Sequence, residues 1–252
     1  MKQLLSPKNL PWFALGAGAV GAILRAWLLL GGVDDKGMLI SGHPAEILCW
    51  ILCAVSFAIM VLGSWNLLEA GKYQYNFPAS LPGAIGAGAA AAGVLYASIC
   101  DLLAGGDTLV MIGCALGFAA AISLGFLAWL RKNGQRPNVL FHFLVCLHLM
   151  FRVIAQYRVW SSDPQIQNYC FQLLALVCLM VSTYQRATFD AKFGMRRAYT
   201  VLRLLCVFFC ILCLPGAHTP LFYLTAAAWA FTDQCNLTPM PRKTKEQEDE
   251  TA

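Results

Sequence analysis

The feature that most constrains this chain is a series of long apolar runs separated by short clusters of basic residues. An α-helix crosses a hydrocarbon core of ~30 Å with about 20 apolar residues, and most of the runs approach that length. Within lipid every backbone N–H and C=O group has to be paired inside the protein, which helices and closed β-barrels achieve. Because the runs lack the alternation of a barrel strand, the sequence predicts an all-α integral membrane protein in contact with the lipid bilayer.

Composition supports this interpretation. Hydrophobic residues make up 59% of the chain and charged residues 12%, about half the charged share of a soluble domain. The formal charge of +5 comes from basic residues that lie between apolar runs, as membrane topology requires, so nucleic acid is not an expected partner. The eleven cysteines lie almost entirely inside apolar runs without zinc-ligand spacing, and we expect no metal or other cofactor.

Eight runs are candidates for membrane-spanning helices. The predicted spans are residues 11–30, 45–68, 81–103, 108–130, 138–157, 165–185, 198–214 and 219–235. The last two are the weakest candidates, with 17 residues each, and the final one either spans or re-enters the membrane. Pro215, Gly216 and Pro220 favour a tight reversal between them.

The positions of lysine and arginine predict the orientation. In an eight-helix arrangement with a cytoplasmic N-terminus, thirteen of these residues lie on the inner side, whereas only Lys36 and Arg158 lie on the outer side. Cytoplasmic loops of membrane proteins carry such an excess. Removing the eighth helix would place the tail outside and change the ratio to ten against five. We therefore predict eight transmembrane helices with both termini in the cytoplasm.

The basic linker after the fourth span divides the chain into two predicted halves of four helices. They cover residues 1–133 and 134–240, and a disordered cytoplasmic tail, residues 241–252, follows them. In the first helix of each half an arginine follows a proline at a similar distance, at Arg25 and at Arg152. Two interpretations explain this agreement: two parallel four-helix repeats, as in some transporters, or chance.

Small residues recur every four positions in the fourth span, at Gly113, Gly117, Ala121 and Gly125. A stripe of this kind lets a neighbouring helix approach closely. The sequence therefore predicts tight packing along this stripe and no chemistry.

Ionisable groups inside the spans are the candidate functional residues, because a charge inside a membrane is costly. Arg25 and Arg152 lie in the outer halves of their helices. His148 and Gln156 lie one helical turn before and after Arg152. With Asp163 in the next outer loop, these residues predict an outward-facing cavity between the halves. Its two arginines would bind the carboxylate or phosphate of a small anionic solute. The alternative is that both arginines extend to the lipid headgroups or pair with an aspartate for topology alone.

A second candidate is the basic loop on the inner side of the sixth and seventh spans, with Arg186, Lys192, Arg196 and Arg197. Basic residues at the cytoplasmic surface of the membrane attract anionic lipid, and a cytoplasmic protein partner is the other candidate ligand for these side chains. Arg203, slightly deeper in the seventh span, is expected to extend toward the same surface.

No motif assigns an activity. The chain lacks the GxxxxGK[ST], HExxH and GxSxG patterns, which argues against an ATPase, a zinc protease and a serine hydrolase. The leading interpretation is a small-solute permease, or a membrane subunit of one, in a bacterial plasma membrane. A sensor or partner-binding protein without transport is the second, and a membrane-embedded enzyme the third. Substrate, coupling ion and oligomeric state stay open.

Overall fold

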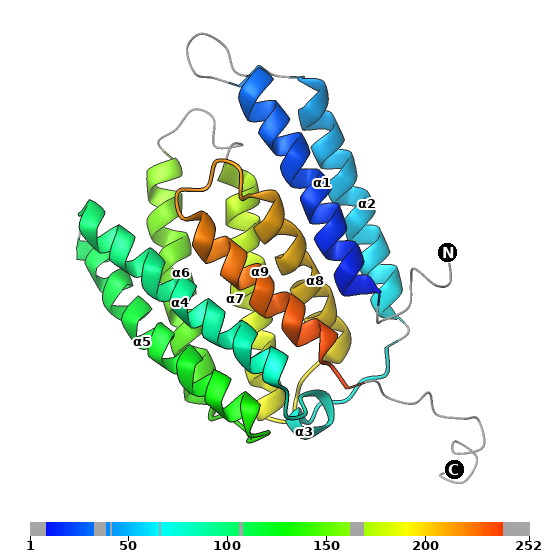
Figure 1. The fold of residues 1–252 in the computed structure, drawn as a ribbon, viewed down its shortest axis with the longest axis vertical. Helices are drawn as coiled ribbons and strands as arrows, with labels where there is room; N and C mark the ends of the chain where they lie inside the picture. Colours follow the sequence, from blue (N-terminus) through cyan, green and yellow to red (C-terminus); the bar gives the residue numbers. More distant parts are fainter. Residues whose placement is uncertain are drawn as a thin grey trace.

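The computed structural model describes residues 9–32, 39–40, 42–65, 67–105, 108–161 and 169–238. These residues form eight long α-helices and one short helix, without a β-strand among them (Figure 1). The long helices are α1 (Leu10–Gly31), α2 (Pro44–Trp65), α4 (Leu81–Ala104), α5 (Thr108–Lys132), α6 (Val139–Trp160), α7 (Cys170–Asp190), α8 (Arg196–Leu212) and α9 (Pro220–Cys235). The short helix α3 covers Tyr73–Asn76. Each long helix overlaps one of the eight apolar runs, so the predicted all-α architecture is confirmed.

Local sequence explains where several helices begin. A proline occupies the first turn of α1, α4 and α9, where its missing N–H group costs no hydrogen bond. The hydroxyl of Ser80 accepts a hydrogen bond from the Gly83 N–H at 3.2 Å and caps α4, and Asn138 caps α6 in the same way. Between α8 and α9, Gly216 adopts a φ of +83°, which glycine tolerates without strain and which closes the predicted tight reversal.

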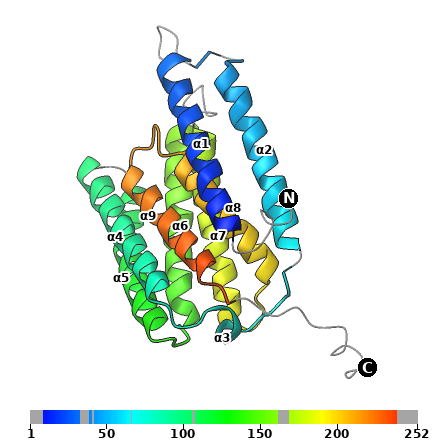
Figure 2. The same cartoon turned by 45° about the vertical axis from the view of Figure 1, so that its right-hand side comes forward.

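Six of the long helices form a closed ring. Each helix from α4 to α9 packs against the next one, and α9 returns to α4. The pair α1 and α2 lies outside this ring and packs mainly against α8 (Figures 1 and 2). We refer to the two ends of the bundle as the α3 end and the cavity end, the latter being the end with the α8–α9 turn. The division into two sequence halves stays a prediction.

The outward faces of the helices are apolar. Large exposed side chains include Ile23 and Leu30 on α1, Leu62 on α2 and Phe126 on α5. The helices α1, α2, α4, α5, α6 and α7 are long and apolar enough to cross a membrane, and they indicate a multi-pass membrane protein. With 17 and 16 residues, α8 and α9 are shorter, at about 25 Å each, but they run between the same two ends.

Small residues mark the closest helix contacts, although only part of the predicted stripe on α5 takes part in them. A Cβ atom added at Gly117 would lie 1.9 Å from Ser98 Oγ on α4 and 2.9 Å from His148 Cε1 on α6. Added Cβ atoms at Gly113 and Gly125 would meet no atom within 4 Å. The prediction of tight packing along the whole stripe is therefore wrong for these two glycines, because no atom of a neighbouring helix lies close to an added Cβ atom at either position.

This difference predicts opposite effects for the same substitution on one helix. Gly117→Ala should destabilise the protein by about 1–3 kcal/mol, because α4 or α6 has to move to accommodate the methyl group. Gly125→Ala is the matched control, and it should be neutral or stabilising by up to ~1 kcal/mol, since alanine favours the helix. Thermal unfolding of both purified variants in detergent measures the difference. Equal stabilities would show that the α4–α5–α6 contact is looser than described.

Candidate functional site

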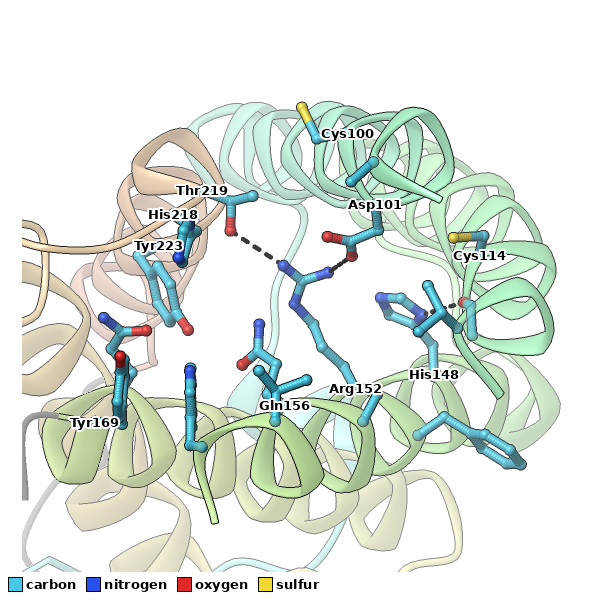
Figure 3. A pocket seen from close by; sticks show the side chains of 18 of the residues that line it. Cys100, Asp101, Cys114, His148, Arg152, Gln156, Tyr169, His218, Thr219 and Tyr223 are labelled. Carbon is cyan, nitrogen blue, oxygen red and sulfur yellow. Dashed lines mark hydrogen bonds and ion pairs between the residues drawn. The ribbon is translucent and has the colours of Figure 1, made fainter. Parts of the chain in front are cut away.

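A cavity of about 390 Å³ lies at the cavity end of the ring (Figure 3). Its wall consists of the C-terminal ends of α4 and α6 and the N-terminal ends of α5, α7 and α9. The volume is in the range of sites for small organic molecules. Its polar lining includes Asp101, His148, Arg152, Gln156, Gln172, His218, Thr219 and Tyr223.

Arg152 of α6 is the central group of this cavity. Its Nη1 atom donates to Asp101 Oδ2 of α4 at 2.6 Å, and its Nη2 atom donates to Thr219 Oγ1 at 3.0 Å. The guanidinium carbon lies 4.7 Å from the centroid of the Phe222 ring, which adds a cation–π contact. The side chain of Arg152 is only 4% exposed, whereas that of Asp101 is 38% exposed. Asp101 therefore lies toward the opening and holds the arginine from that side.

Three further polar atoms at the cavity have no hydrogen-bond partner among the described residues. They are Nε2 of His148, Oε1 of Gln156 and the hydroxyl of Tyr223. The other ring nitrogen of His148, Nδ1, lies 3.2 Å from the carbonyl oxygen of Gly113. Buried polar atoms without partners are costly in an empty protein core, and a polar ligand or water that reached them would satisfy them.

Aromatic side chains form the wall near the start of α7. The rings of Trp160 and Tyr169 stack with centroids 4.8 Å apart and an interplanar angle of 8°. Gln172 of α7 donates to the carbonyl oxygen of Gly216 at 3.1 Å. This bond fixes the α8–α9 turn next to Thr219, so the turn that positions one partner of Arg152 is itself anchored.

The structure brings together three of the five residues that the sequence predicts for the site. His148, Arg152 and Gln156 all line the cavity from α6. Arg25 does not, because α1 lies outside the ring, and its guanidinium group is 5.6 Å from the Phe171 ring instead. The expected convergence of Arg25 and Arg152 on one solute is therefore not found. Asp163 lies outside the described residues.

Below the cavity, the centre of the ring is apolar. Side chains of α4, α5, α6, α7 and α9, among them Leu124, Leu149 and Trp229, leave a void of only about 10 Å³. That is the lower limit for a single water molecule. The cavity is thus separated from the α3 end by a dry layer.

A buried cluster of charges follows at the α3 end. Asp233 of α9 accepts hydrogen bonds from Arg186 of α7 and from Nη2 of Arg203 of α8, the latter at 3.0 Å. The hydroxyl of Tyr199 lies 3.4 Å from the same carboxylate and accepts from Arg203 Nε at 3.2 Å. The Arg203 guanidinium group also lies 4.0 Å from the Trp229 ring. All these side chains are at most 1% exposed.

This cluster corrects two predictions. Arg203 does not extend to the membrane surface, because α1, α7 and α9 enclose α8 and Asp233 compensates the charge. Arg186 does not belong to an exposed basic loop for the same reason. Arg196 is also buried and donates to the carbonyl oxygen of Thr238. Only Lys192 and Arg197 remain exposed among the four predicted residues.

Sequence reasoning identified no charge partner for these arginines. Asp101, Thr219, Tyr223 and Asp233 are not among the site residues that the sequence predicts. One signal pointed to Asp233: it lies near the inner end of the last apolar run, at the depth of Arg186 and Arg203 in their own runs.

Comparison with known proteins gives no further indication, since no family model, curated protein or solved structure matches the chain.

Proposed function

We propose that the chain is a small-solute permease, or the membrane subunit of one, with eight transmembrane helices. The cavity end faces the outside of the cell membrane, and the α3 end and both termini face the cytoplasm. The observation that carries this proposal is the asymmetry of the ring: within the described residues, a polar cavity occupies one end, and a dry layer and buried ion pairs close the other. This is the arrangement expected of a transporter in its outward-facing state.

Opening toward the cytoplasm would require two changes in the ring. Trp229 and its apolar neighbours would have to separate, and Asp233 would have to exchange at least one of its arginine partners. Trp229 belongs to both the dry apolar layer and the buried cluster of charges, because it lines the small void and contacts Arg203. We therefore place the inner closure of the proposed permease at this residue.

A specific observation favours a second candidate function, that of a sensor or partner-binding protein. The turn between α7 and α8 exposes Lys192, Phe193 and Met195, the start of α8 exposes Arg197, and Phe193 is 82% exposed. Exposed apolar and basic residues in one turn are suited to an anionic lipid surface or a cytoplasmic partner.

Filling the cavity tests the proposed function. Ala155 lines the cavity next to Gln156, so Ala155→Trp should remove the stabilisation that a bound solute gives to the parent protein. Gly125→Trp is the control, because it adds the same ring where a Cβ atom meets nothing within 4 Å. A solute screen by thermal shift in detergent, followed by flux of any hit into proteoliposomes, measures both steps. Binding without flux favours the second candidate, and a hit that Ala155→Trp still binds excludes the cavity.

Topology is testable separately. Reporter fusions after Lys8 and after Lys245 should both be active in the cytoplasm, because both flanks are basic and an even number of spans returns the chain to its starting side. A periplasmic or extracellular signal from the second fusion alone would mean that α9, the shortest long helix with 16 residues, does not cross the membrane.

A further inference from the structure

We propose that the cavity takes zwitterionic solutes, which carry both a carboxylate and a protonated amine as amino acids do, and that it discriminates against simple anions. This inference rests on the proposed function, because it names the substrate class of the same cavity. It departs from the anionic solute that the arginines alone predict. The juxtaposition of Arg152 with Asp101 is what carries it.

The charges that the described residues bring to the cavity cancel. Among these residues, Arg152 and Asp101 are the only lining residues with a formal charge when histidines are neutral, and their side chains are 2.6 Å apart. An anion bound to Arg152 would therefore lie beside the carboxylate of Asp101, and these two negative charges would repel each other. A zwitterion meets each of the two charges with an opposite one.

Arg152 keeps enough donors for a carboxylate. A guanidinium group has five N–H donors in a planar fork, and within the described parts of the chain only the bonds to Asp101 and Thr219 use them. The Nε atom has no hydrogen-bond partner among the described residues. Because Phe222 supports one face of the guanidinium group, its plane is already oriented for a carboxylate of the solute.

The remaining unpaired atoms favour an amine. His148 Nδ1 faces a carbonyl oxygen, which only accepts, so it carries the hydrogen and the Nε2 of a neutral ring is an acceptor. In Figure 3, His148 and Gln156 lie on opposite sides of Arg152. Together with the Asp101 carboxylate, His148 Nε2 on one side of Arg152 and Gln156 Oε1 on the other thus offer acceptors to an amine on either side. A protonated amine has N–H donors for Asp101 and for the acceptor on its own side.

The rest of the lining fits an apolar side group. Phe151, Trp160 and Tyr169 line the cavity together with aliphatic residues, and the rings of Trp160 and Tyr169 stack on each other. Aromatic rings pack favourably in offset or edge-on arrangements. A zwitterion with an aromatic or aliphatic side group is therefore the class that uses the whole cavity.

Three probes with one carbon skeleton test this inference: phenylalanine, 3-phenylpropionate, which lacks the amine, and 2-phenylethylamine, which lacks the carboxylate. Phenylalanine should bind the parent protein at least about tenfold more tightly than either analogue, a difference of ~1.4 kcal/mol, and inorganic phosphate should not bind. In Asp101→Asn, which leaves Arg152 without its counter-charge, 3-phenylpropionate should gain about tenfold and the preference for phenylalanine should disappear. Thermal shift and calorimetric titration in detergent measure these affinities.

Two results would overturn the substrate class. If 3-phenylpropionate or phosphate binds the parent more tightly than phenylalanine, the cavity is an anion site, and the proposed function survives. If no probe binds, the zwitterion proposal fails, and labelling of Cys100 decides about the function. Cys100 lines the cavity, so a membrane-impermeant thiol reagent applied from outside should modify it in the parent and not in Ala155→Trp. Mass spectrometry locates the label, and an unlabelled Cys100 would reject the outward-facing cavity as well.

Discussion

Asp233→Asn is expected to lower the free energy of unfolding by about 3–5 kcal/mol, because it leaves buried arginines without their counter-charge. Asparagine has nearly the same shape as aspartate, so the change creates no cavity. It removes the negative charge that pairs with both Arg186 and Arg203, and both arginines are at most 1% exposed. The two arginines then lie in the interior without the carboxylate that joins them, where water does not screen their repulsion. Thermal or denaturant-induced unfolding of the purified protein in detergent measures the loss.

The same substitution at the other end of the ring is the control. Asp101 also pairs with a buried arginine, but its own side chain is 38% exposed. Solvent screens such a pair, so Asp101→Asn should cost no more than about 1 kcal/mol. If the two variants lose equal stability, water reaches the Asp233 cluster and it does not close the α3 end. The proposed inner closure would then have to be abandoned.

The positions of the long helices could be predicted because lipid imposes a simple rule on sequence. Every span needs about 20 apolar residues, and the chain marks the ends of its runs with prolines, glycines and basic clusters. The short helix α3 escaped this rule, since a helix of four residues leaves no apolar period to recognise. Packing between helices encloses α8 and leaves α1 and α2 outside the ring. No single apolar run encodes this packing.

The candidate site was predictable along one helix and not across helices. His148, Arg152 and Gln156 are four residues apart, and this spacing places them on one face of any α-helix. Asp101 and Thr219 reach Arg152 only because α9 closes the ring against α4. A single sequence does not reveal such pairings, because the paired residues are 51 and 67 positions apart. The similar depth of Arg25 suggested a shared site that the position of α1 does not permit.

The variants of Arg152 should have the largest effect on solute binding. Arg152→Ala is expected to weaken the binding of any carboxylate-bearing solute by about 30-fold or more, as truncation of a buried charged partner costs at least ~2 kcal/mol. Arg152→Lys should be nearly as harmful. The arginine bonds Asp101 and Thr219 through different nitrogens and lies against Phe222, and lysine keeps the charge but loses the planar fork that makes these contacts together.

Arg25 provides the matched control for this prediction. It is equally buried, at 5% exposure, but it does not line the cavity. Arg25→Lys should therefore leave the solute affinity unchanged, measured by calorimetric titration with the solute that stabilises the parent most. The topological interpretation of Arg152 makes the opposite prediction, because a lysine there would extend to the headgroups as readily as the arginine. If Arg152→Lys keeps both its stability and its affinity for the solute, the charge of Arg152 serves topology alone and the cavity binds its solute without a guanidinium contact.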